Sequence, residues 1–194
     1  MRRSLGLLSV LGLVGFAVVA CDQSPQIQTI PLGFTIVEGL INISQTDPTL
    51  ASVILSSTGG NCPAYQTGLN VTNISQTDAL VFSLQVQDGD GGFLPIVAGD
   101  YTVEMNYLPA AGNYAFVTEF ETSLICQVTP TGSNSGTVTL NPFDPGHASD
   151  TSYSVVFGYD QFVGDFPLTT CLIPPTATVP DAGTCYLPGG GGPI

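Results

Sequence analysis

The feature that most constrains this fold is a series of short segments in which every second residue is apolar, separated by turns rich in glycine, proline, asparagine and aspartate. The clearest segment places Tyr153, Val155 and Phe157 on one face of an extended chain, as in a strand that buries one side. No stretch of eleven or more residues shows a convincing helical period. The segments expected to form strands are 34–37, 50–56, 80–87, 101–107, 114–121, 123–128, 136–140 and 153–159. Their spacing predicts an all-β protein, a single antiparallel β-sandwich over residues 33–174.

Positive charge is confined to Arg2 and Arg3, whereas all 15 aspartates and glutamates follow residue 20. The chain after residue 20 therefore has a formal charge of −15. A surface without cations cannot neutralise phosphates, so we expect no nucleic-acid partner. Sites that need lysine or arginine, such as P-loops and Schiff-base centres, are excluded for the same reason.

The N-terminus combines a short positive region with an uncharged apolar run over residues 5–20, which is shorter than a membrane-spanning helix. The last residues of this region, Val-Val-Ala-Cys at 18–21, resemble the lipobox of bacterial lipoproteins. The resemblance implies a signal peptide over residues 1–20, a lipid on Cys21 and a tether over residues 21–32. It also implies a membrane-anchored, extracytoplasmic place in the bacterial cell envelope. The alternative is an ordinary signal peptide followed by a chance cysteine.

The other four cysteines form an even set in a chain addressed to an oxidising compartment, which predicts two disulfides. Three pairings are possible. The short, proline- and glycine-rich loop between Cys171 and Cys185 favours that pair, which leaves Cys62 to pair with Cys126. No two cysteines have zinc-ligand spacing, so we expect no zinc site. Residues 175–194 are expected to form a tail stapled by a disulfide, with a flexible glycine-rich end.

The best candidate for a metal ligand is the segment Asp88-Gly-Asp90-Gly-Gly. Two aspartates on a flexible loop offer oxygen ligands to calcium, but the segment departs from the EF-hand pattern. A hairpin turn is the favoured alternative. The residues that follow, 95–103, weakly resemble a turn and strand of bacterial immunoglobulin-like and transthyretin-like sandwiches.

A second candidate site consists of carboxylates on strands. Glu119 and Glu121 would share one face, with Glu104 on a neighbouring strand, and glycosidases use two carboxyl groups roughly 5 to 9 Å apart. The tyrosines that could stack on a sugar ring are Tyr101, Tyr107 and Tyr114. The favoured alternative is that these acids lie on a solvated face.

A hexapeptide, Asn-Ile-Ser-Gln-Thr-Asp, occurs twice, at residues 42–47 and 73–78. We expect both copies to form the same strand-turn-strand unit, in which the aspartate opens the turn. The flanking residues differ, so the repeat does not predict a solenoid or a propeller.

Catalytic groups are sparse. The only histidine, His147, stands among turn formers, and the segment 132–136 has asparagine where a nucleophile elbow needs serine. We therefore assign no catalytic residue and no cofactor other than the calcium candidate. The sequence predicts a non-catalytic binding or structural module anchored to membrane lipid through Cys21, with a cation or a carbohydrate as the expected class of ligand. The alternative is a small carbohydrate-active or carbohydrate-binding protein.

Overall fold

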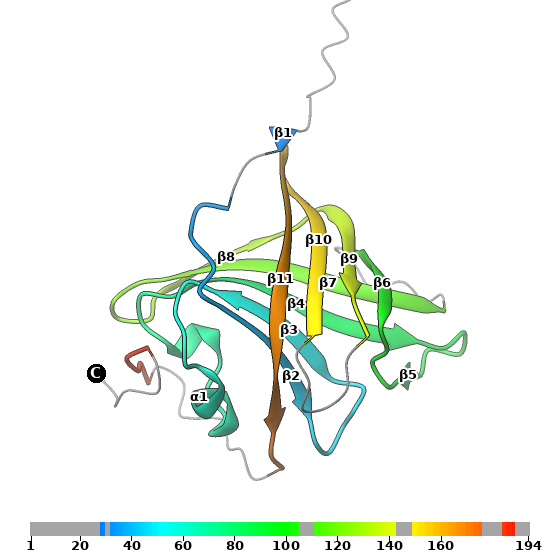
Figure 1. Cartoon of the computed structure of the whole chain (residues 1–194), viewed down its shortest axis with the longest axis horizontal. Helices are drawn as coiled ribbons and strands as arrows, with labels where there is room; N and C mark the ends of the chain where they lie inside the picture. The colour runs from blue at the N-terminus through cyan, green and yellow to red at the C-terminus, as the bar shows by residue number, and fades with distance from the viewer. Residues whose placement is uncertain (1–27, 30–31, 105–110, 143–148, 176–183, 189–194) are drawn as a thin grey trace, which may run out of the picture.

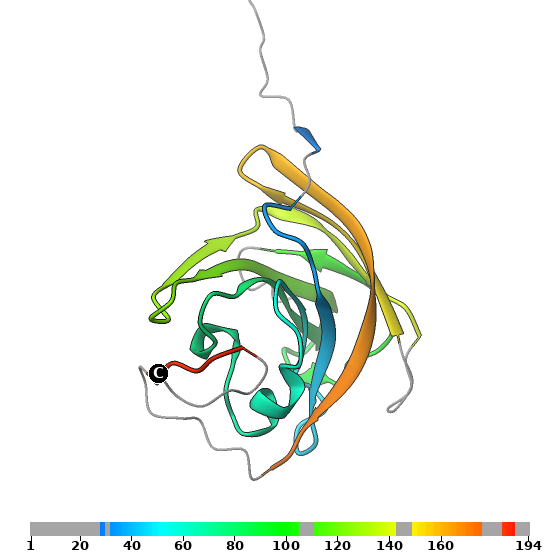
Figure 2. The same ribbon diagram turned by 60° about the vertical axis from the view of Figure 1, so that its left-hand side comes forward.

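The computed structural model describes residues 28–29, 32–104, 111–142, 149–175 and 184–188. The protein is all-β, as predicted, but the β-sandwich is wrong because eight strands close into a barrel (Figures 1 and 2). The barrel strands are β2 (Glu38–Ser44), β3 (Ala51–Ser56), β4 (Asp78–Gln87), β6 (Gly99–Val103), β7 (Gly112–Thr122), β9 (Ser135–Leu140), β10 (Ser149–Phe157) and β11 (Asp160–Ile173). The remaining elements are β1 (Gln28–Thr29), β5 (Phe93–Leu94), β8 (Val128–Gly132), the helix α1 (Cys62–Gln66) and the 3-10 turn η1 (Val71–Asn73).

The ring runs in the order β4-β3-β2-β11-β10-β9-β6-β7 and is closed by the antiparallel pairing of β7 with β4. That closing pairing extends from Asp78 opposite Glu121 to Gln87 opposite Gly112. Two neighbouring pairs, β2 with β11 and β6 with β7, are parallel. Each of the eight strands thus has a partner on both sides, whereas the sheets of a sandwich keep free edges.

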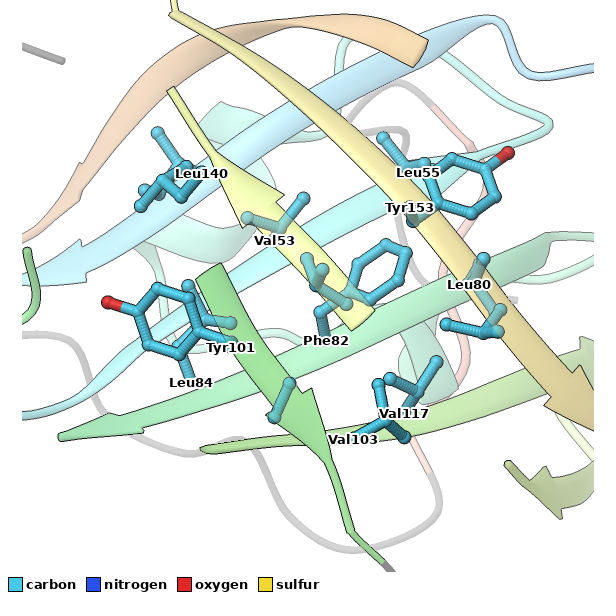
Figure 3. Close-up of a cluster of buried hydrophobic side chains, with 14 of the residues drawn as sticks. Val53, Leu55, Leu80, Phe82, Leu84, Tyr101, Val103, Val117, Leu140 and Tyr153 are labelled. Atoms are coloured by element: carbon cyan, nitrogen blue, oxygen red, sulfur yellow. The ribbon is translucent and has the colours of Figure 1, made fainter. Parts of the chain in front are cut away.

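The barrel interior is a packed core. Inward-facing side chains from all eight strands fill it, as expected for a barrel of this strand number. The rings of Phe82 and Tyr153 lie 5.5 Å apart between their centroids near its centre. The core side chains labelled in Figure 3 are Val53, Leu55, Leu80, Phe82, Leu84, Tyr101, Val103, Val117, Leu140 and Tyr153.

A second apolar layer lies outside the barrel wall. The segment that contains α1 and η1 covers the outer face of β2, β3, β4 and β11. The buried residues of this layer are Leu40, Ile54, Tyr65, Val71, Ile74, Ala79 and Cys171. Within the part of the chain that the structure describes, no helix is long and apolar enough to cross a membrane.

Several expected strands have different bounds. Residues 34–37 precede β2 rather than forming a strand, and residues 123–127 form the turn between β7 and β8. The longest strand, β11, was not predicted because Gly164 and Pro167 interrupt its alternation. Pro167 is tolerated where β11 pairs with β10 alone, before its pairing with β2 begins at Thr169.

The repeated hexapeptide does not form a repeated unit. In the first copy, residues 42–44 end β2, and Asp47 opens a turn by accepting hydrogen bonds from the backbone N–H and the hydroxyl of Thr49. In the second copy, Asn73 ends η1 and Asp78 begins β4. Because the two copies have different neighbours, the expected duplication is wrong.

Candidate functional site

The two predicted disulfides are present, but the favoured pairing is wrong. Cys62 pairs with Cys171, and Cys126 pairs with Cys185. The favoured pairing relied on closeness in sequence, whereas the fold brings together cysteines that are 109 and 59 residues apart. The Cys62–Cys171 disulfide fastens the start of α1 to the outer face of β11.

Beside this disulfide, the α1–η1 segment and the barrel wall enclose a groove of about 610 Å³. The roof consists of Tyr65 and residues 68–72, and the floor is the outer face of β2, β3 and β4. This volume lies within the range of pockets that bind small molecules. We refer to it as the outer groove.

The floor of the outer groove has an apolar part and a polar part, which follow one another along the strands. Its apolar part is formed by Ile54 of the second apolar layer, and by Val81 and Phe120, which pack against that layer. Phe120 comes from the neighbouring strand β7. Its polar part is a row across three strands, in which Ser52 lies opposite both Asn42 and Ser83. In a strand, residues two apart lie next to each other on the same face. Ser52 is two residues from Ile54, and Ser83 is two residues from Val81, so the polar row lies directly beside the apolar part. The groove therefore fits a ligand with an apolar body and a polar end.

Three residues that line the outer groove carry a buried side-chain oxygen without a hydrogen-bond partner among the described residues. They are Asn42 Oδ1, Tyr65 Oη and Gln85 Oε1. Burial, with a smaller effect of the Glu38 carboxylate, raises the pKa of Tyr65 well above its ordinary value, so its phenol is neutral. Leaving a buried polar group unpaired costs about 1–3 kcal/mol, so a partner for these oxygens would stabilise a bound state.

The roof of the groove continues into a segment that the C-terminal residues hold in place. Tyr186 forms two backbone hydrogen bonds of 2.9 Å, one to the N–H of Ser75 and one to the carbonyl of Asn73. The Cys126–Cys185 disulfide fastens the same residues to the turn between β7 and β8. Residues 184–188 of the predicted stapled tail are therefore held against the segment that continues the roof, as Figure 2 shows for the red segment.

The structure brings Glu119 and Glu121 together, as the sequence predicted, and adds Asp78. All three line a pocket of about 290 Å³ on the continuation of the inner sheet face, beside Phe34. Burial, and then the neighbouring carboxylates of Asp78 and Glu121, raise the pKa of Glu119. A raised pKa on a carboxyl group close to other carboxyl groups is a feature shared with the general acids of enzymes.

The other expected parts of a carbohydrate site do not join this pocket. Glu104 follows β6, where its N–H donates to the carbonyl of Ala115, and it does not line the pocket. The ring of Tyr101 is buried in the barrel and Tyr114 is also buried, so neither can stack on a sugar. The prediction of stacking tyrosines is wrong for these two residues, and Tyr107 lies outside the described residues.

Asp88 and Asp90 lie in the turn between β4 and β5. One carboxylate oxygen of Asp88 accepts hydrogen bonds from the backbone N–H groups of Asp90, at 3.0 Å, and Gly92, at 2.7 Å. This arrangement is the hydrogen-bonded turn that was the favoured alternative. Over the described ranges, no group of three or more histidine, cysteine, aspartate or glutamate residues could hold a metal ion.

Replacing Asp88 and Asp90 together by asparagine is expected to leave the effect of millimolar calcium on Tm unchanged. The Asp88 oxygen already accepts two N–H groups, whereas screening of the −15 charge by calcium does not depend on this turn. Calorimetry of both proteins with and without calcium measures the difference. A rise in Tm that disappears in the double variant would instead identify the turn as a calcium site.

The lipidation candidate Cys21 and the histidine His147 lie outside the described residues. Sequence reasoning missed every residue of the outer groove. Two signals lay near it: the repeated hexapeptide, whose Asn42 and Ser44 line the groove, and Cys62-Pro63, since proline often stands at the start of a helix. A five-residue helix shows no period, and the polar residues of the floor look like ordinary solvent-facing positions of strands.

Comparisons of the chain with protein-family models, with curated proteins and with solved structures found no match. Function is therefore inferred from the chemistry of the sites themselves.

Proposed function

We propose that the protein is a non-catalytic, extracytoplasmic binding module, anchored to a bacterial membrane through a lipid on Cys21, which binds a small uncharged amphiphilic ligand in the outer groove. The observation that carries the proposal is the groove itself, which has an apolar floor beside a polar row and is lined by three buried oxygens without a hydrogen-bond partner among the described residues. Among the described residues, core side chains from all eight strands fill the interior of the barrel.

The chemistry of the groove defines the class of ligand. Asn42 Oδ1 and Gln85 Oε1 are acceptors, so the polar end of the ligand carries an N–H or O–H donor. The chain after residue 20 has no lysine or arginine to pair with an anionic ligand, and its formal charge of −15 repels anions. Ile54, Val81 and Phe120 receive the apolar body.

Two observations support the proposed location. The residues at 18–21 resemble a lipobox, and two disulfides form between distant parts of the fold, as is usual in oxidising compartments. The Cys62–Cys171 disulfide fastens one end of the segment that roofs the groove, and the Cys126–Cys185 disulfide holds the residues to which the other end hydrogen-bonds. Formation of both disulfides in an oxidising compartment would therefore support the binding site.

Binding is tested with N-phenyl-1-naphthylamine, a neutral aromatic amine with one N–H donor whose fluorescence rises in apolar surroundings. The mature chain is exported with Cys21→Ser, so that no acyl chain competes for the probe. We expect saturable binding of one probe per chain. Ser83→Trp, which fills the groove from an exposed position on β4, is expected to raise Kd about tenfold or more, equivalent to about 1.4 kcal/mol.

The matched control is Thr102→Trp, an equally large substitution at an exposed position on β6, which does not line the groove. It is expected to leave Kd unchanged. Absence of saturable binding, or equal affinities for both variants, would contradict the proposal for the groove.

A further inference from the structure

We propose that the end of the barrel formed by the β10–β11 hairpin rests on the bilayer, with Tyr159 at the level of the lipid headgroups, and that the outer groove faces away from the membrane. This inference rests on the proposed lipid anchor at Cys21. It adds the surface that contacts lipid and the direction in which the binding site opens.

The first observation is the point at which the tether joins the barrel. The strand β1 pairs in parallel with the start of β11, so that Gln28 lies opposite Asp160 (Figure 1). Gln28 is seven residues after Cys21. A fully extended chain of seven residues spans at most about 25 Å. A lipid on Cys21 therefore keeps the β10–β11 end of the barrel within that distance of the bilayer.

The second observation is the chemistry of the hairpin between β10 and β11. Tyr159 is 62% exposed at its tip, and Val163 is 59% exposed on the outer face of β11 nearby. An exposed tyrosine presents an apolar ring with a polar end, which suits the boundary between headgroups and acyl chains. The chain after Arg3 has no lysine or arginine that would attract anionic headgroups, so the contact of this surface with the bilayer depends on the tyrosine ring.

Hydrogen bonds from residues 133 and 134 hold the β10–β11 hairpin in a fixed orientation relative to the barrel. Ser133 Oγ donates a hydrogen bond of 2.8 Å to the carbonyl of Val156, and the N–H of Asn134 donates to the same carbonyl at 2.7 Å. Gly158 supplies the left-handed backbone, with φ of 62°, that the tight turn needs.

The third observation is the distance from the hairpin to the outer groove. β11 has 14 residues, begins at the hairpin and ends at Ile173, which lines the groove. A strand of this length rises about 40–45 Å. Since the segment from Cys21 to Gln28 is shorter than this strand, contact at the hairpin places the groove on the distal side, open to solutes of the compartment.

The test uses the full-length lipoprotein in phosphatidylcholine vesicles, with the mass of the N-terminal peptide measured first to establish the lipid on Cys21. The chain has no tryptophan, so a single substitution creates one tryptophan, whose fluorescence can be excited separately from that of the tyrosines. The three variants are Tyr159→Trp, Phe93→Trp and Ile125→Trp, all at exposed positions. Phe93 lies on β5 near the opposite end of the barrel, and Ile125 lies in the turn between β7 and β8.

Quenching by lipids with brominated acyl chains reports contact with the bilayer. Tyr159→Trp is expected to lose about half of its fluorescence, as an indole at the membrane interface would, whereas the other two variants keep theirs. Quenching of Phe93→Trp or Ile125→Trp, or no quenching of Tyr159→Trp, would overturn the orientation while a lipid on Cys21 still upheld the anchor. A Cys21 without lipid would overturn both.

Discussion

Replacing Cys62 and Cys171 together by serine is expected to lower the free energy of unfolding by about 4–5 kcal/mol, the value that chain entropy gives for a loop of this length. The disulfide closes a loop of 109 residues and joins α1 to β11. The side chain of Cys171 is fully buried, so the serine hydroxyl would add a further penalty there. Urea unfolding followed by circular dichroism measures the change.

The same substitution is expected to weaken probe binding in the outer groove. The disulfide is the covalent link between the barrel and the segment that carries Tyr65 and residues 68–72. The matched comparison is Cys126→Ser with Cys185→Ser, which opens the second disulfide but leaves α1 fastened to β11. A loss of less than about 1 kcal/mol in the Cys62 and Cys171 double variant would show that non-covalent packing holds α1 without the disulfide.

Gly136→Ala is expected to destabilise the protein by about 3 kcal/mol or more. Gly136 lies in β9 between β10 and β6, with φ of 141°, a conformation that side chains rarely adopt. A Cβ atom there would overlap the carbonyl oxygen of Ser154 and lie 2.8 Å from Cα of Val155. Both contacts are with backbone atoms of β10, which cannot move aside as a side chain could. The overlap can therefore be removed only if the β9–β10 pairing opens.

Gly132→Ala is the control for this substitution. Gly132 is exposed on β8, its φ is not positive and a Cβ atom would meet nothing within 4 Å. The Gly132→Ala substitution is expected to change the free energy of unfolding of the protein by about 0.5 kcal/mol or less. Equal losses for the two variants would contradict the steric account of the barrel wall at Gly136.

The two copies of the hexapeptide show that local sequence alone does not determine backbone conformation in this protein. Identical residues end a strand at 42–44 and a 3-10 turn at Asn73. In the first copy the strand pairs with β3 and β11, whereas in the second Asn73 and Ser75 hydrogen-bond to Tyr186, more than a hundred residues away. Neighbours that are distant in sequence therefore selected the conformation of each copy.

The sequence predicted only part of the carboxylate pocket, the part that depends on neighbours within one strand. Glu119 and Glu121 are two residues apart on one strand, and the period of two is sufficient to place them on one face. Asp78 joins them only because β4 pairs with β7 in the register that sets it opposite Glu121. Glu104 stays apart because β6 runs parallel to β7 and ends beside Ala115.

The sequence by itself determined the all-β class, the even set of disulfide-forming cysteines and the absence of lysine and arginine after Arg3, because alternation, composition and cysteine number are local or additive properties. Only the tertiary structure decided that the sheet closes into a barrel, that Cys62 meets Cys171, and that α1 roofs a groove. The physical reason is that alternation fixes which face of a strand is buried but not which strand lies beside it. Closure depends on the pairing of β4 with β7, which also sets Asp78 opposite Glu121 and brings Phe120 to the outer groove.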